Sequence, residues 1–165
     1  MPAIAPARET PKAYEPIPSG VDAVTWSYDE FLQRILEAHA GSEFWRSLPF
    51  ELARKQLGEL TTLGPDWDSY GAEPPNETAV DAAERILELL RTMSIPPTRV
   101  VASSEGGVAI CFAEEDRYAD FECFNDGDIA AVRFRGTERP IVWEVPPEDD
   151  HIKAAIEQIR AHFTA

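Results

Sequence analysis

The second half of the chain contains five short apolar segments separated by brief turns. They are residues 99–103, 108–112, 118–124, 129–135 and 141–145. Parallel neighbours need a crossover connection of about a dozen residues, so connections this short allow only antiparallel neighbours. The sequence therefore predicts a five-stranded antiparallel meander, in which each strand pairs with the next.

The turns between these segments support the same topology. Asn125-Asp126-Gly127-Asp128 gives the strongest hairpin signal, because these residue types adopt positive φ angles at low cost. Gly106-Gly107 lies between two strands and predicts a hairpin, whereas a phosphate loop would join a strand to a helix. Pro140 lacks a backbone N–H group, which predicts either an edge position or a strand entry at the start of the fifth strand.

Two helices are predicted before the meander from the spacing of their apolar residues. The first begins at Ser27 and Glu30, which have the spacing of a capping box, and ends near His39. The second is predicted from about Pro49 to Thr62, with Leu52, Ala53, Leu57 and Leu60 facing inward.

A third helix is predicted directly before the meander and a fourth after it. Asn76 is a good N-cap for the third, which runs to about Leu90. The last helix carries one apolar stripe that needs an apolar surface, and a face of the meander offers it: Ile152, Ile156, Ile159 and Phe163. The predicted fold class is α+β, with N-terminal helices and a two-layer arrangement of the meander and the C-terminal helix.

Residues 1–20 contain five prolines, at positions 2, 6, 11, 16 and 18. Proline at this density prevents regular helix and sheet hydrogen bonding and favours extended chain. We therefore predict an extended or disordered arm over residues 1–20 and a single α+β domain over residues 21–165. The arm could lie along a partner, or it could be a leader without a binding role.

The composition is strongly acidic, with 30 Asp and Glu against 15 Lys and Arg and a formal net charge of -15. Such a chain is poorly suited to the phosphate backbone of nucleic acids or to an anionic membrane surface. It suits a basic protein partner, because opposite charges accelerate encounter and set specificity. Acidity that serves only solubility is the alternative interpretation.

Cys111 and Cys123 are the two cysteines, and each lies in an apolar segment. No histidine stands at metal-ligand spacing from them, so we expect neither a metal site nor a cofactor. Buried, reduced thiols and the lack of a signal peptide favour a cytoplasmic setting.

The loop between the second and third helices contains Asp66, Trp67, Asp68 and Tyr70. Asp66 and Asp68 could bind Mg²⁺ or act as nucleophile and acid, and the two aromatic rings could stack on a ligand. The alternative, which the surrounding prolines and glycines favour, is that the carboxylates accept backbone hydrogen bonds and that Gly71 adopts a positive φ.

The predicted hairpin tips carry further acidic residues, which are solvated tips or an acidic rim that a basic partner could contact: Glu114, Glu115, Asp116, Asp126 and Asp128. Their spacing does not fit a calcium-binding loop.

Residues 57–90, with Trp67-Asp68-Ser69-Tyr70-Gly71-Ala72 at their centre, resemble a family of small uncharacterised bacterial proteins. That family carries a Trp-Asp-x-Tyr-Gly-Ala loop, a helix and then a glycine-rich strand pair. The resemblance implies a helix followed by an antiparallel sheet, and a mobile-element or defence setting. The chain departs from the family in its strands, where Cys111-Phe112 and Trp143 occupy the stretch in which many members carry a second Trp.

Charge, the lack of a catalytic pattern and the resemblance together predict a non-enzymatic protein-interaction module. It would act by occluding a protein partner, as an inhibitor, immunity protein or antitoxin does. One alternative is a small hydrolase or ligand-binding domain that uses the loop from Asp66 to Tyr70. Another is a DNA-mimic inhibitor, which would need two parallel rows of carboxylates at phosphate spacing.

Overall fold

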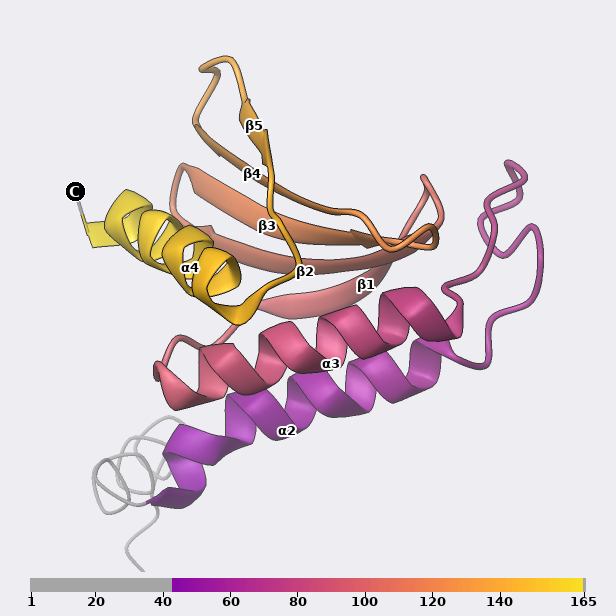
Figure 1. Ribbon diagram of the computed structural model, residues 1–165, viewed down its shortest axis with the longest axis horizontal. Helices are drawn as coiled ribbons and strands as arrows, with labels where there is room; N and C mark the ends of the chain where they lie inside the picture. The colour runs from indigo at the N-terminus through magenta and orange to yellow at the C-terminus, as the bar shows by residue number, and fades with distance from the viewer. Residues whose placement is uncertain (1–42, 165) are drawn as a thin grey trace, which may run out of the picture. The chain divides into compact units, whose positions relative to one another are not determined.

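A five-stranded antiparallel sheet forms the centre of the structure, a computed structural model (Figure 1). Its strands are β1 (Arg99–Ser103), β2 (Gly107–Glu114), β3 (Arg117–Phe124), β4 (Ile129–Arg135) and β5 (Ile141–Glu144). They lie in the sheet in the order of the sequence, and β1 and β5 are the two edges. The predicted meander and the edge position of the strand after Pro140 are confirmed.

The structure describes residues 43–164. The arm predicted over residues 1–20, the domain boundary after it and the helix predicted over residues 27–39 lie outside the described residues.

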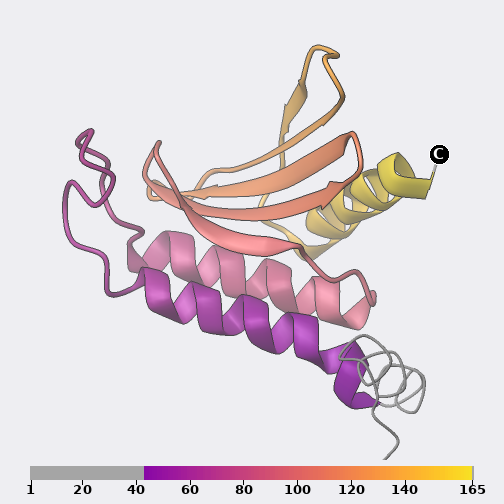
Figure 2. The same cartoon turned by 180° about the vertical axis from the view of Figure 1, so that it is seen from behind.

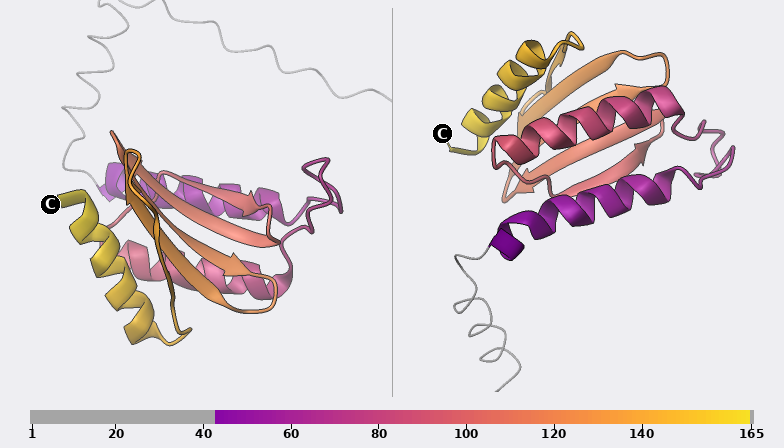
Figure 3. Two further views of the ribbon diagram at one scale, coloured as in Figure 1. Left: turned by 90° about the horizontal axis from the view of Figure 1, so that it is seen from above. Right: turned by 60° about the horizontal axis from the view of Figure 1, so that its bottom comes forward.

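Three helices pack on one side of the sheet: α2 (Glu43–Leu60), α3 (Glu77–Thr92) and α4 (Asp149–Thr164). Helix α3 lies across the strands, with α2 beside it at β1 and α4 near β3 and β4 (Figures 2 and 3). The predicted α+β class is therefore confirmed. Among these three helices none is long and apolar enough to cross a membrane.

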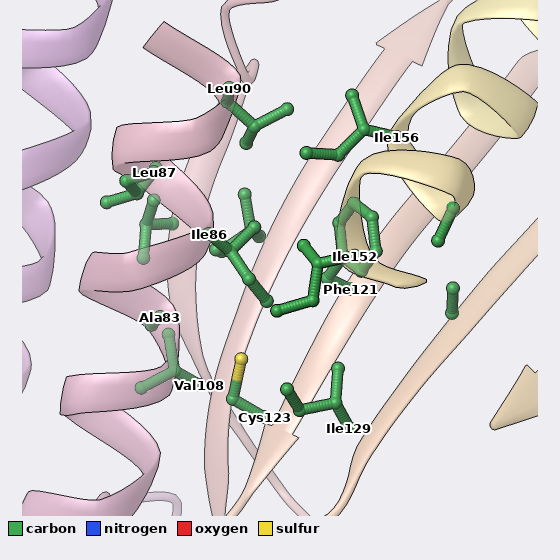
Figure 4. Packing of buried hydrophobic residues seen from close by; sticks show 14 of the residues in the cluster. Ala83, Ile86, Leu87, Leu90, Val108, Phe121, Cys123, Ile129, Ile152 and Ile156 are labelled. Carbon is green, nitrogen blue, oxygen red and sulfur yellow. The ribbon is translucent and has the colours of Figure 1, made fainter. Parts of the chain in front are cut away.

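The face of the sheet that α3 and α4 cover is called the inner face here. Its apolar side chains alternate along the strands, and Ile110, Phe121 and Cys123 are completely buried. Ile86 of α3 and Ile152 of α4 meet them from the helices (Figure 4). The stripe predicted for the last helix is confirmed, since its three isoleucines are buried in this core.

The start of α3 is tied to the β3–β4 turn by paired asparagines. Asn76 caps the helix, because its Oδ1 accepts a hydrogen bond from the N–H of Ala79 at 3.0 Å. Its own N–H donates to Oδ1 of Asn125, and its Nδ2 donates to the Asn125 carbonyl, both at 2.8 Å. Asn125 Nδ2 also donates to the Pro74 carbonyl at 3.0 Å. The predicted N-cap is confirmed, and it also fixes the helix to the sheet.

Helix α2 differs from the sequence prediction in two respects. It begins at Glu43 and contains Pro49, so a start at Pro49 was wrong. The proline is the seventh residue of this helix, beyond the four N-terminal residues whose N–H groups lack a helical partner, so its missing N–H costs the helix one hydrogen bond. Leu52 was predicted to face inward but is 52% exposed, because the buried stripe follows Phe50, Ala53 and Leu57.

Gly107 occupies a position that only glycine fits. Its φ is +146°, and a Cβ built there would lie 2.1 Å from the carbonyl oxygen of Cys123 on β3. Gly58 of α2 is the opposite case, because a Cβ there meets nothing within 4 Å.

We therefore expect Gly107→Ala to lower the free energy of unfolding by about 3 kcal/mol, through strain and overpacking. Gly58→Ala should raise it by about 1 kcal/mol, because alanine favours helix. Urea unfolding followed by circular dichroism measures both, and a Gly107→Ala protein as stable as the wild type contradicts the strand packing described here.

Candidate functional site

Backbone hydrogen bonds occupy both carboxylates of the predicted loop site. Asp68 Oδ1 accepts from the N–H groups of Tyr70 at 2.8 Å and Ala72 at 3.1 Å. Asp66 Oδ1 accepts from the N–H of Gly71 at 2.7 Å. The bonds from Tyr70 and Ala72 hold the pKa of Asp68 below its usual value. A carboxylate with a lowered pKa is a poor proton donor, so this geometry does not favour a general acid at Asp68.

The aromatic side chains of the same loop differ in their environment. Trp67 is half-buried, and its Nε1 donates to the carbonyl of Glu73 at 3.4 Å. Tyr70 is 94% exposed. Gly71 has a φ of +90°, as predicted, and Asp66 and Ser69 also have positive φ angles. The loop is thus a tight structure in which the ring of Tyr70 projects outward.

The predicted acidic tips lie at opposite ends of the sheet. Glu114, Glu115 and Asp116 form the β2–β3 end, whereas Asp126 and Asp128 lie in the β3–β4 turn. These turns are separated by the eight residues of β3, a length of about 25 Å. The loop from Asp66 to Tyr70 lies at the second end, because Asn125 bonds to the chain just after that loop.

Hydrogen bonds and ion pairs also engage some of the tip carboxylates. Asp116 Oδ2 accepts from Arg135 Nε at 3.0 Å, and this bond lowers the pKa of Asp116. Asp126 Oδ1 accepts from the N–H of Asp128 at 3.1 Å. Glu114 and Glu115 are exposed. The structure therefore does not gather the predicted site residues into one surface.

A different surface stands out on the face of the sheet opposite α3 and α4, called the outer face here. In the described part of the chain no helix packs on it. One row of residues crosses all five strands on this face: Arg99, Cys111, Asp120, Val132 and Val142. Tyr118 and Phe134 form the next row, with their rings stacked at 5.0 Å. An uncovered sheet face normally carries mostly polar side chains, and this one is largely apolar.

Asp120 lies at the centre of the outer face. Its Oδ1 atom is buried and has no hydrogen-bond partner in the part of the chain that the structure describes. Burial raises the pKa of Asp120, the nearby Tyr118 hydroxyl lowers it in part, and the charge of Glu122 raises it further. A buried polar atom without a partner is costly, and such atoms concentrate at functional sites.

The two cysteines point to opposite faces of the sheet, and both are buried free thiols. Cys111 lies on the outer face, and its Sγ accepts a hydrogen bond from the Tyr118 hydroxyl at 3.4 Å. Burial, together with this contact, raises the pKa of Tyr118. Burial raises the pKa of Cys123 on the inner face to about 12. A thiol that stays protonated is not a nucleophile, so Cys123 has a packing role.

Grooves open on the helical side. One of about 450 Å³ lies between α2 and α3, where Arg54 Nη2 donates to Glu88 Oε2 at 2.7 Å. Another of about 320 Å³ is lined mainly by apolar side chains, among them Phe112, Ile159 and Phe163. Within residues 43–164 no group of three His, Cys, Asp or Glu side chains is placed to hold a metal ion.

An exposed face or edge of the meander, rimmed by the acidic tips, was predicted as the contact surface, but Asp120 and its apolar neighbours were not singled out because each strand was considered separately. The signal was present in the second half of the meander, where the residues of β4 that do not face the core are Ala130, Val132 and Phe134. In a half-exposed strand those positions are normally polar. The alternation of side chains along a strand places Ala130, Val132 and Phe134 on one face, but only the pairing register of β3 and β4 shows that they lie around Asp120.

The two aspartates Asp68 and Asp120 should show opposite effects on stability. The raised pKa of Asp120 means that the folded state loses stability as the pH rises from 3.8 through the folded pKa. Asp120→Asn should therefore raise the free energy of unfolding by about 1 kcal/mol at about pH 7, and this gain should disappear near pH 3.

The lowered pKa of Asp68 contributes stability above 3.8 that is lost as the pH falls through the folded pKa. Asp68→Asn should therefore lower stability at neutral pH, with a difference that shrinks in acid. Urea unfolding of both variants across this pH range is the measurement. The prediction is contradicted if both variants change the free energy of unfolding in the same direction at neutral pH.

Comparisons of the chain with known protein families, with curated proteins and with solved structures give no match. The resemblance of the loop to a bacterial family stays a prediction. The outer face and its central aspartate are thus the features from which a function must be inferred.

Proposed function

We propose that this chain is a non-enzymatic protein-interaction module that binds a basic protein partner through the outer face of its sheet. It acts by covering the partner's surface, as inhibitors, immunity proteins and antitoxins do. The buried thiols of Cys111 and Cys123 are compatible with a reducing cytoplasm, which we propose as its location. A bacterial defence or mobile-element setting follows from the resemblance of the loop.

The observation that carries this proposal is the buried Oδ1 atom of Asp120, which has no hydrogen-bond partner among residues 43–164 and lies in a largely apolar surface that none of the described helices covers. Val132 and the stacked rings of Tyr118 and Phe134 offer apolar contact around it. A cationic or N–H donor from a partner would satisfy the aspartate after a local shift of the side chains that cover Oδ1, and the surrounding side chains would exclude water from the pair. Interfaces of this form have an apolar centre with few, well-placed polar contacts.

The charge of the chain supports a basic partner. The formal net charge is -15, and Glu122 and Glu144 lie on the outer face near Asp120. A field of this sign attracts a positively charged surface and accelerates encounter. The alternative of a hydrolase or ligand-binding site in the loop from Asp66 to Tyr70 has less support, because the carboxylates of Asp66 and Asp68 already accept backbone hydrogen bonds.

The proposal is tested with the full chain as bait in a lysate of its native host, followed by titration of the retained protein. Asp120→Asn should weaken binding at least tenfold, because a donor on the partner would lose its charged acceptor. Asp81→Asn is the matched control, since it removes the same charge from an exposed position on α3. That control should bind like the wild type.

Salt gives a second measurement for the same complex. Binding should weaken between about 0.1 M and about 1 M salt, where the Debye length falls from about 10 Å to about 3 Å. The proposal fails if no protein is retained at low salt. It also fails if Asp120→Asn and Asp81→Asn bind equally well.

A further inference from the structure

The two edges of the sheet are treated differently by the rest of the chain. At β1 the side chain of Gln56 from α2 accepts a hydrogen bond from the N–H of Val100 at 2.8 Å, so this edge is partly closed. At β5 no element of residues 43–164 lies beyond the strand, and the β4–β5 hairpin projects from the sheet (Figure 1). Ile141 and Val142 of β5 are 55% and 63% exposed.

An open edge that exposes apolar side chains on both faces is unusual. Proteins commonly protect edge strands with charges, prolines or bulges, because unpaired N–H and C=O groups invite another strand. Pro140 protects only the entry to β5, and the three residues after it are apolar: Ile141, Val142 and Trp143. We propose that β5 pairs with β5 of a second copy of this chain, antiparallel and about a two-fold axis.

The backbone of β5 has the hydrogen-bonding groups that this pairing needs. The N–H of Val145 donates to the carbonyl of Ile129 on β4 at 2.8 Å. The backbone N–H and C=O groups of successive residues in a strand point alternately to one neighbouring strand and to the other. Those of Val142 and Glu144 therefore point away from β4. Pro140 turns its carbonyl the same way and can accept a bond from the second copy, but it has no N–H to donate in return, so the pairing lacks that one bond from each copy.

A two-fold axis requires one residue of β5 to face its own copy, and the side chains distinguish the possible registers. With Val142 facing Val142, each Ile141 faces a Trp143, so the central pairs are apolar. With Ile141 at the axis, Glu144 faces Glu138 of the other copy, and like charges oppose each other. With Trp143 at the axis, Val142 faces Glu144. The geometry therefore selects the register centred on Val142.

Local charge permits this contact despite the acidity of the whole chain. The β4–β5 hairpin carries Arg133, Arg135 and Arg139 against Glu138 and Glu144. Repulsion between two copies therefore comes mainly from acidic residues elsewhere, at distances that salt screens. Association of the two copies should strengthen as salt rises, whereas binding of a basic partner to the outer face should weaken.

Sedimentation equilibrium of the full chain measures this self-association at low and high salt. The wild type should dimerise, more tightly at high salt, and Val142→Lys should be monomeric, because a charge at the centre of the strand prevents pairing. Leu52→Lys is the matched control, since Leu52 is also an exposed apolar residue, on α2. It should dimerise like the wild type.

A cysteine at the two-fold axis tests the register. Residues that face each other on antiparallel strands have Cα atoms about 5.5 Å apart, within the range of a disulfide. Val142→Cys should therefore form a covalent dimer under mild oxidation, and Glu157→Cys on α4 should not. Cys111 and Cys123 are 2% and 0% exposed, so they should not compete.

Three outcomes overturn the proposal. The first is a wild type that stays monomeric at all concentrations and salts. The second is a dimer that Val142→Lys leaves intact, and the third is equal cross-linking of Val142→Cys and Glu157→Cys. None of them tests the partner site: self-association is measured without the basic partner, and partner binding is compared only among the wild type, Asp120→Asn and Asp81→Asn, because Val142 itself lies on the outer face.

Discussion

Phe121 lies where the sheet, α3 and α4 meet, and its burial against both helices holds the described structure together. Its ring packs edge-on against Phe112 at 6.4 Å, within the same apolar layer. A meander alone does not bury enough surface to be stable, so the helices must cover one of its faces. Since α3 and α4 both pack on the inner face, neither of them covers the outer face. The candidate site around Asp120 is on the outer face because the core occupies the inner one.

Much of the fold could be predicted because its determinants are local. The turn at Asn125 to Asp128, the cap at Asn76 and the edge position after Pro140 each depend on the conformational preferences of a few adjacent residues. The prediction failed where packing decides between local alternatives. Leu52 and Phe50 both fit an amphipathic helix, and only contact with the core shows that Phe50 is the buried one.

The candidate site was harder to predict, for a different reason. The loop from Asp66 to Tyr70 is conspicuous in the sequence because it combines acidic and aromatic residues, yet its carboxylates accept bonds from the loop's own backbone. Asp120 is inconspicuous, one acidic residue within a strand. Its importance depends on the register, which surrounds it with Val132, Cys111 and Tyr118 from three strands. Chemistry that arises from pairing between strands is not encoded in any short motif.

The hydrogen bond from Val100 to Gln56 has a consequence for how large an assembly of this protein can become. A sheet with two open edges can add copies at both ends and grow into a fibre, which is the route to amyloid-like aggregates. Among residues 43–164, the side chain of Gln56 occupies one donor of β1 and α2 packs beside that strand, so β5 is the more open of the two edges. The proposed pairing uses β5 on both copies, and further growth would then have to take place at the partly closed β1 edge. Gln56 thus disfavours an open-ended polymer.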